Sequence, residues 1–133
     1  MDNAGDVVIS MALANNPTIE ELNYQGLLTY GLPKLAENGI TPFCEGRTYW
    51  KKNYHNIWKR IHEENKLTAR AMLGFWAYPD DNLPILINDI KALKFTGDDM
   101  LRGNQIKVYS DGITINAAAA LHEDYVAPHL GWP

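Results

Sequence analysis

Segments with a helical pattern alternate along the chain with segments patterned like strands. The helical segments repeat apolar side chains every three or four positions, whereas the strand segments are short and apolar. The helical segments are residues 18–37, 47–65 and 83–93, and the strand segments are residues 40–45, 67–78 and 106–110. Strands separated by helices pair in parallel through crossover connections. The sequence therefore predicts an α/β fold with three parallel strands.

The length of the chain limits how large such a sheet can be. We expect its 133 residues to form one α/β domain, 1–133. A complete (β/α)₈ barrel takes about 250 residues, and three parallel strands leave two sheet edges without partners. The chain is therefore either a small open α/β domain or part of a larger fold.

Composition excludes several classes of protein. The net charge is −4, and the basic residues at positions 51, 52, 59 and 60 alternate with apolar residues of one helix, so a nucleic-acid partner is not expected. The single cysteine, Cys44, excludes an intramolecular disulfide framework and a zinc site built from cysteines. The sequence has no run of about 18 apolar residues and no signal-peptide pattern. We therefore expect no membrane partner and a cytoplasmic protein.

Lys107 is the most informative single residue, because it stands in the middle of an otherwise apolar strand. A buried lysine is unfavourable unless a neighbouring group neutralises or uses its charge. Alternation along the strand predicts that Lys107, Tyr109 and Asp111 share one face. Lys107 is then either an ion-paired structural residue, with Asp111 or Glu45 as its partner, or a chemical group of a site.

Other candidates carry weaker signals. Glu45 ends the first predicted strand, where it is a candidate to line a substrate pocket, and its neighbour Cys44 is expected to be a small buried side chain. The histidines have no metal-ligand spacing: we expect two to lie on the surface of a helix and two in a loop-like tail, in the order His55, His62, His122 and His129.

Four stretches occur in an order typical of one enzyme family. Residues 35–41 read Leu-Ala-Glu-Asn-Gly-Ile-Thr, and a helix rich in Tyr and Trp follows. Residues 65–70 read Asn-Lys-Leu-Thr-Ala-Arg, residues 106–112 read Ile-Lys-Val-Tyr-Ser-Asp-Gly, and residues 117–125 carry four alanines, a leucine and a final tyrosine. In this order and spacing the chain resembles the amidohydrolase-3 group of metal-dependent hydrolases.

The resemblance implies a fold, a metal and a reaction. The fold would be part of a TIM barrel, with the three predicted strands as barrel strands 2 to 4. Lys107 would match the fourth-strand lysine, which in many relatives is carboxylated and bridges two divalent metals, most often zinc. The reaction would be hydrolysis of carbon–nitrogen bonds in a small-molecule amide, and the metals would activate water and polarise the carbonyl.

The same resemblance indicates what the chain lacks. The family's His-x-His pair and its later metal ligands have no counterpart here, so no catalytic or cofactor-binding residue is assigned beyond Lys107 as a metal ligand. We therefore expect an internal segment of a longer enzyme that is inactive alone and either self-associates or binds the remaining parts of the barrel. The alternative is a small α/β binding or interaction module without catalysis, in which Lys107 is ion-paired.

Overall fold

A computed structural model of the chain describes residues 8, 11–13, 16, 18–79, 81–114 and 117–126. The chain divides into two compact units. Asn16–Val108 forms one unit, and Met1–Asn15 together with Tyr109–Pro133 forms the other. The sequence also predicts a short helix over residues 6–14, most of which lies outside the described residues; Val8 and 11–13 are described and are helical.

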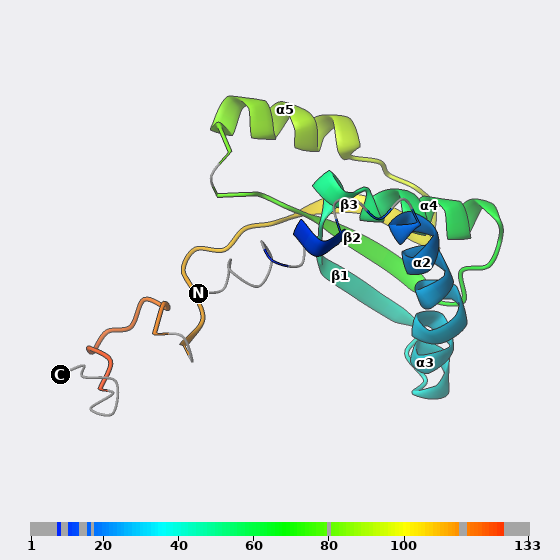
Figure 1. Cartoon of the computed structure of the whole chain (residues 1–133), viewed down its shortest axis with the longest axis horizontal. Coiled ribbons are helices and arrows are strands. Elements are labelled where there is room, and N and C mark those ends of the chain that lie inside the picture. The colour runs from blue at the N-terminus through cyan, green and yellow to red at the C-terminus, as the bar shows by residue number, and fades with distance from the viewer. Residues whose placement is uncertain are drawn as a thin grey trace. The chain divides into compact units, whose positions relative to one another are not determined.

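The unit Asn16–Val108 is an α/β structure built on three parallel strands (Figure 1). The strands lie in the order β1-β2-β3, so the predicted α/β fold with three parallel strands is confirmed. In chain order the elements are α2 (Ile19–Gly26), a π turn (Leu27–Gly31), α3 (Leu32–Glu37), β1 (Pro42–Thr48), a 3₁₀ turn (Trp50–Lys52), α4 (Tyr54–Glu63), β2 (Arg70–Trp76), α5 (Leu83–Leu93) and β3 (Leu101–Lys107).

The hydrophobic core lies on one face of the sheet. Ala71 and Leu73 of β2 and Leu101 of β3 pack against buried side chains of the helices, which are Tyr24, Leu32, Ile57, Trp58 and Ile61. Helix α5 packs through Leu86 and Ile90 against Phe75, which alternates with Leu73 on the same face. The opposite face, which we call the open face, carries no described helix of this unit.

The first helical segment changes its hydrogen-bond register before a proline. In the π turn Leu27–Gly31, the amide of Leu32 donates to the carbonyl of Leu27, five residues back. Pro33 follows directly and has no amide hydrogen to donate, which explains why the ordinary pattern gives way near it. The segment ends as predicted at Gly39, whose φ of +69° lets the Ile40 amide reach the Leu35 carbonyl at 2.9 Å.

Several predicted boundaries are wrong. Strand β1 extends to Thr48, so Arg47 belongs to a strand and not to the start of the next helix. Strand β3 occupies Leu101–Lys107 and not 106–110, because its exposed polar residues at 102, 104 and 105 make it look like a loop. Helix α5 matches its prediction, although Leu83 and Ile87 on its predicted apolar face are exposed.

Candidate functional site

Lys107 is the last residue of β3 and lies at the carboxyl end of the sheet. It pairs in register with Trp76 of β2, and the Ala77 amide donates to the Lys107 carbonyl at 2.8 Å. Its side chain is half-buried. In parallel α/β folds, ligand and catalytic sites lie at this end of the strands. The structure thus places the one metal-ligand candidate of the sequence where such sites are found.

A bulge in β3 decides which face of the sheet Lys107 occupies. Met72 pairs with Arg102, but Gly74 pairs with Gln105, so β3 contains one extra residue between these pairs. Strict alternation from buried Leu101 would turn Lys107 toward the helices. Because of the extra residue, Lys107 instead shares the open face with Trp76.

The bulge depends on a glycine. A Cβ atom at Gly103 would lie 2.1 Å from Cε1 of the Phe95 ring. Phe95 and Gly103 form an antiparallel bridge, with amide-to-carbonyl distances of 2.9 and 3.1 Å. Only glycine lets the two backbones and the ring approach this closely.

A second bulge acts in the same way on β1. Glu45 pairs with Leu73 and Thr48 pairs with Phe75, so β1 also carries one extra residue. Thr48 is fully buried on the helix face, and Arg47 is turned to the other face. The Arg47 guanidinium carbon there lies 4.1 Å from the centroid of the Trp76 ring. Arg47, Trp76 and Lys107, one from each strand, therefore share the open face at the carboxyl end.

Aromatic rings and cations surround this point, and we call them the aromatic–cation cluster: Arg47, Tyr49, Trp50, Lys51, Trp76 and Tyr78. The Trp76 and Tyr78 ring centroids are 4.3 Å apart, and Trp50 Nε1 donates to the Trp76 carbonyl at 2.7 Å. Lys51 Nζ lies 4.3 Å from the Tyr78 ring centroid and 2.5 Å from Asp81. Attraction between the cations and the ring faces holds these side chains in place.

Burial makes Tyr78 a poor acid within this cluster. Loss of hydration raises the pKa of Tyr78 to about 12, so its hydroxyl stays protonated at neutral pH. The cluster therefore combines a neutral Tyr78 hydroxyl with aromatic rings and cations at the strand end that carries Lys107.

The predicted shared face of Lys107, Tyr109 and Asp111 is not formed on one strand. Strand β3 ends at Lys107, and the other two residues belong to the second unit of the chain. There Asp111 Oδ2 accepts a hydrogen bond from the Ala120 amide at 2.9 Å. Asp111 thus organises the loop that follows, as its position in an acidic turn predicts.

Glu45 and Cys44 lie on opposite faces of β1. The Glu45 carboxylate lies on the helix face, where Oε2 accepts a hydrogen bond from Trp58 Nε1, so Glu45 and Lys107 are on different faces. The prediction that Cys44 is buried is wrong: its thiol is exposed on the open face and donates to Gln105 Oε1 at 2.9 Å. Gly74, between them on β2, leaves the space in which these two side chains meet.

His55 and His62 both lie on α4, on the helix side of the sheet. His55 is buried, contrary to the prediction of a surface position, and burial lowers its pKa. His62 Nε2 lies 2.9 Å from Asp98, and His122 is exposed in the second unit. His129 lies outside the described residues. Within the described ranges, no three His, Cys, Asp or Glu side chains are grouped as metal ligands.

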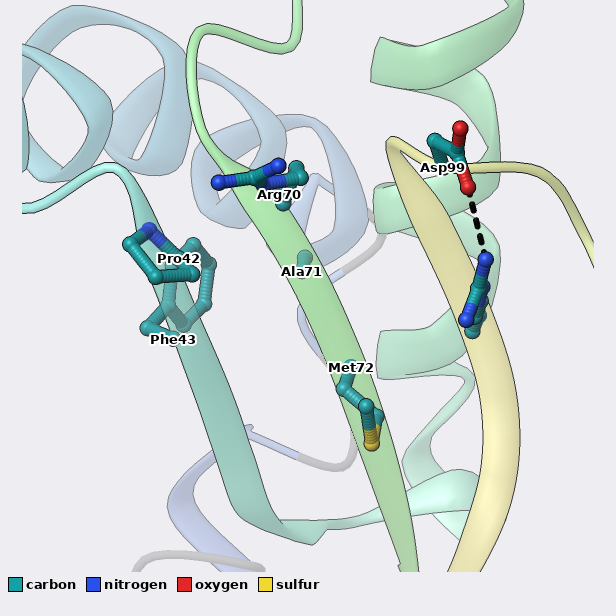
Figure 2. A pocket seen from close by; sticks show the side chains of 7 residues that line it. Pro42, Phe43, Arg70, Ala71, Met72 and Asp99 are labelled. Atoms are coloured by element: carbon teal, nitrogen blue, oxygen red, sulfur yellow. Dashed lines mark hydrogen bonds and ion pairs between the residues drawn. The ribbon is translucent and has the colours of Figure 1, made fainter.

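A cavity lies at the amino ends of the strands, opposite the end that carries Lys107 (Figure 2). It has a volume of about 350 Å³ and is lined by Pro42, Phe43, Arg70, Ala71, Met72, Asp99 and Arg102. Arg102 forms an ion pair with Asp99 at 2.7 Å. Arg70 is exposed and lies beside Pro42, at the start of β1. Because it lies at the amino ends of the strands, this cavity is separate from the Lys107 site.

Sequence reasoning missed Arg47 and Tyr78 as site residues. The signal was the pair of aromatic runs at the strand ends, Arg-Thr-Tyr-Trp at 47–50 and Trp-Ala-Tyr at 76–78. In the part of the chain that is described, no helix combines the length and the apolar character needed to cross a bilayer. No family model matches the chain, and neither the curated proteins nor the solved structures contain a significant match.

Proposed function

We propose that the chain supplies strands 2 to 4 of a (β/α)₈ catalytic barrel in a metal-dependent amidohydrolase that cleaves carbon–nitrogen bonds of small amides. One observation carries the proposal. Lys107 ends a parallel strand on the face away from the helices, and in a closed barrel that face would point to the axis. The sequential order of the parallel strands and the helices on one face also support it.

The residues of the chain fit one position of a metal site and no more. A neutral lysine amine becomes an anionic oxygen ligand when it is carboxylated, and Lys107 has the strand-end position for that role. The rest of the donor set has no counterpart among the described residues. We therefore assign no catalytic step to this chain alone; in the assembled barrel, divalent cations would activate water and polarise the amide carbonyl.

The chain's own contribution to the reaction would be to position side chains around the substrate. Arg47 and Trp76 lie on the same face as Lys107. The bulge in β1 turns Arg47 to that face, and the bulge in β3 turns Lys107 to it. Bulges next to active sites commonly redirect one side chain in this way. The cluster would form one wall of the substrate site and hold the amide beside the metals.

The test compares two lysine variants of the complete enzyme encoded by the reading frame that contains this chain. Lys107→Gln is expected to lose bound metal, measured by elemental analysis, and to reduce hydrolysis of N-formyl and N-acetyl amides more than about 100-fold. Lys94→Gln, which removes an exposed charge next to α5, is the matched control and is expected to keep both. Equal metal content and rate in the two variants would refute the assignment of Lys107.

The 133-residue chain provides a second test. Because it lacks most ligands of the site, we expect it to bind zinc weakly and to hydrolyse no amide. Metal-dependent turnover by the purified chain would contradict the proposal that it is a segment of a larger barrel.

A further inference from the structure

A second, smaller cavity lies on the helix side of the sheet, away from Lys107. It has a volume of about 150 Å³ and is lined by Asn23, Leu27, Glu45, Tyr54, Ile57 and Trp58. These residues come from α2, the π turn, β1 and α4, so the cavity lies between elements of one unit and is partly open to solvent. Pockets for drug-sized ligands measure about 300–1,000 Å³, so this one admits only a molecule of a few heavy atoms.

The chemistry of the wall is unusual for a packing gap. Glu45 alone is charged among the six lining residues, and the rest of the wall is mostly apolar and aromatic. Trp58 Nε1 binds Glu45 Oε2, and the Trp58 ring is itself fixed against Phe43 with centroids 5.3 Å apart. A carboxylate held among apolar groups without a positive partner is unfavourable. A cationic ligand would supply that partner.

The backbone beside the cavity is irregular as well. Leu27, one of the lining residues, is the first residue of the π turn. Single π turns within helices are rare and occur frequently at functional sites. The π turn and the Glu45 carboxylate therefore border the same cavity.

We infer that this cavity binds a small organic ammonium ion, with Glu45 as its counter-charge and the rings of Tyr54 and Trp58 as its aromatic walls. Ammonium groups bind to the faces of aromatic rings and to carboxylates at the same time. A divalent metal fits less well, because it prefers six or more oxygen ligands and the wall supplies one carboxylate and one amide. The inference does not depend on Lys107, since the cavity is on the other face of the sheet.

The experiment follows the indole N–H signal of Trp58 by NMR while tetramethylammonium chloride is added to the chain at constant ionic strength. The signal is assigned with Trp58→Phe. We expect a saturable shift with a Kd on the order of 1 mM, as suits so small a ligand. The neutral analogue tert-butanol, which has a similar size and shape, is expected to cause no saturable shift.

Two variants separate the carboxylate from the rings. Glu45→Gln keeps an acceptor for Trp58 and removes the charge, so it is expected to weaken binding by at least roughly tenfold. Tyr54→Leu keeps the charge and removes one ring face, so it is expected to weaken binding by roughly threefold. The matched control is Glu37→Gln, which removes an exposed charge and is expected to change nothing.

Two results would overturn the inference. One is a shift of equal size and midpoint with tert-butanol, which would indicate an apolar cavity. The other is an unchanged affinity in Glu45→Gln and Tyr54→Leu, which would place the ammonium ion elsewhere. Loss of amide hydrolysis by the assembled enzyme bears on neither result, so the two proposals can fail separately.

Discussion

Glu45 and Glu64 are two carboxylates whose surroundings act on them in opposite directions. Loss of hydration raises the pKa of Glu45, and the hydrogen bond from Trp58 only partly offsets it. Glu64 is exposed to solvent, and Lys66 Nζ at 2.6 Å, followed by the Tyr24 hydroxyl, lowers its pKa to about 2. Burial therefore disfavours the charged form of Glu45, whereas the partners of Glu64 favour its charged form.

The raised pKa of Glu45 predicts a pH dependence of stability. Above its ordinary pKa of 4.5 the unfolded chain releases the proton first, so the folded state loses stability as the pH rises from 4.5 through the raised pKa. Glu45→Gln removes this loss. We expect the free energy of unfolding in urea, measured without added ammonium ions, to favour the variant increasingly over this window. An advantage that is independent of pH would contradict the raised pKa.

The lowered pKa of Glu64 predicts the reverse trend. Its contribution to stability is present above pH 4.5 and is lost as the pH falls through about 2. Lys66→Met removes the main cause, so the carboxyl ¹³C titration of Glu64 is expected to move up toward 4.5. Lys34→Met, which breaks an exposed pair with Glu37 on another helix, should leave that titration in place.

Among the elements, β3 depends most on its local backbone. It is an edge strand with an exposed polar face, and the bridge to Phe95 borders it at Gly103. The Asp98 carboxylate accepts hydrogen bonds from the Met100 and Leu101 amides at 2.7 and 3.0 Å and so organises the turn into the strand. The Asp98 turn, the Phe95 bridge and the bulge together fix the register of β3. Burial of apolar side chains cannot fix it, because residues 102, 104 and 105 of the strand are polar and exposed.

Gly103→Ala tests this dependence. The added methyl group would collide with the Phe95 ring, so we expect a loss of about 1–3 kcal/mol in the free energy of unfolding. Gly26→Ala is the matched control, because a Cβ atom there meets nothing within 4 Å and the residue is helical. It is expected to gain about 0.5–1 kcal/mol. If Phe95→Leu restores none of the loss in Gly103→Ala, the collision is not its cause.

At the scale of the whole molecule, the described elements of Asn16–Val108 cover one face of the sheet. The outer edge of β1 is not paired with any described strand, and the open face carries half-buried Met72 beside exposed Cys44. Edges and faces of this kind normally meet further strands or a partner chain. A barrel would supply such strands, whereas the isolated chain must find them in other copies of itself.

We therefore expect the purified chain to self-associate. Its average mass in sedimentation should rise with concentration in the presence of a reductant, which excludes disulfide formation by the exposed Cys44. Cys44→Lys places a charge on the edge strand and is expected to reduce association. Ile87→Lys adds the same charge on exposed α5 and serves as the control. A compact monomer at all concentrations would indicate a self-sufficient module.

The sequence predicts where helices and strands lie better than it predicts which face of the sheet each side chain occupies. Helix α5 is predictable from its Asn82 cap, Pro84 in the first turn and the regular spacing of its apolar residues. Strand β2 is predictable from a run of apolar residues, most of which are buried in the centre of the sheet. The carboxyl end of β3 is predicted by Ile106 and Lys107, but its amino end is hidden by polar residues. Each bulge contains a glycine, Gly46 or Gly103, but a glycine alone does not fix the position of a bulge, and the prediction places Arg47 in the wrong element.

The bulge before Gln105 makes the orientation of Lys107 sensitive to an insertion or deletion in β3. The extra residue reverses the alternation of side chains between the two faces of the sheet. Odd-numbered residues before the bulge and odd-numbered residues after it therefore point to opposite faces. Removing Asn104 would leave every functional group in the sequence and still rotate Lys107 inward against the helices. The face that Lys107 occupies is therefore set by a neighbouring residue, and a deletion of one position there would move Lys107 to the other face.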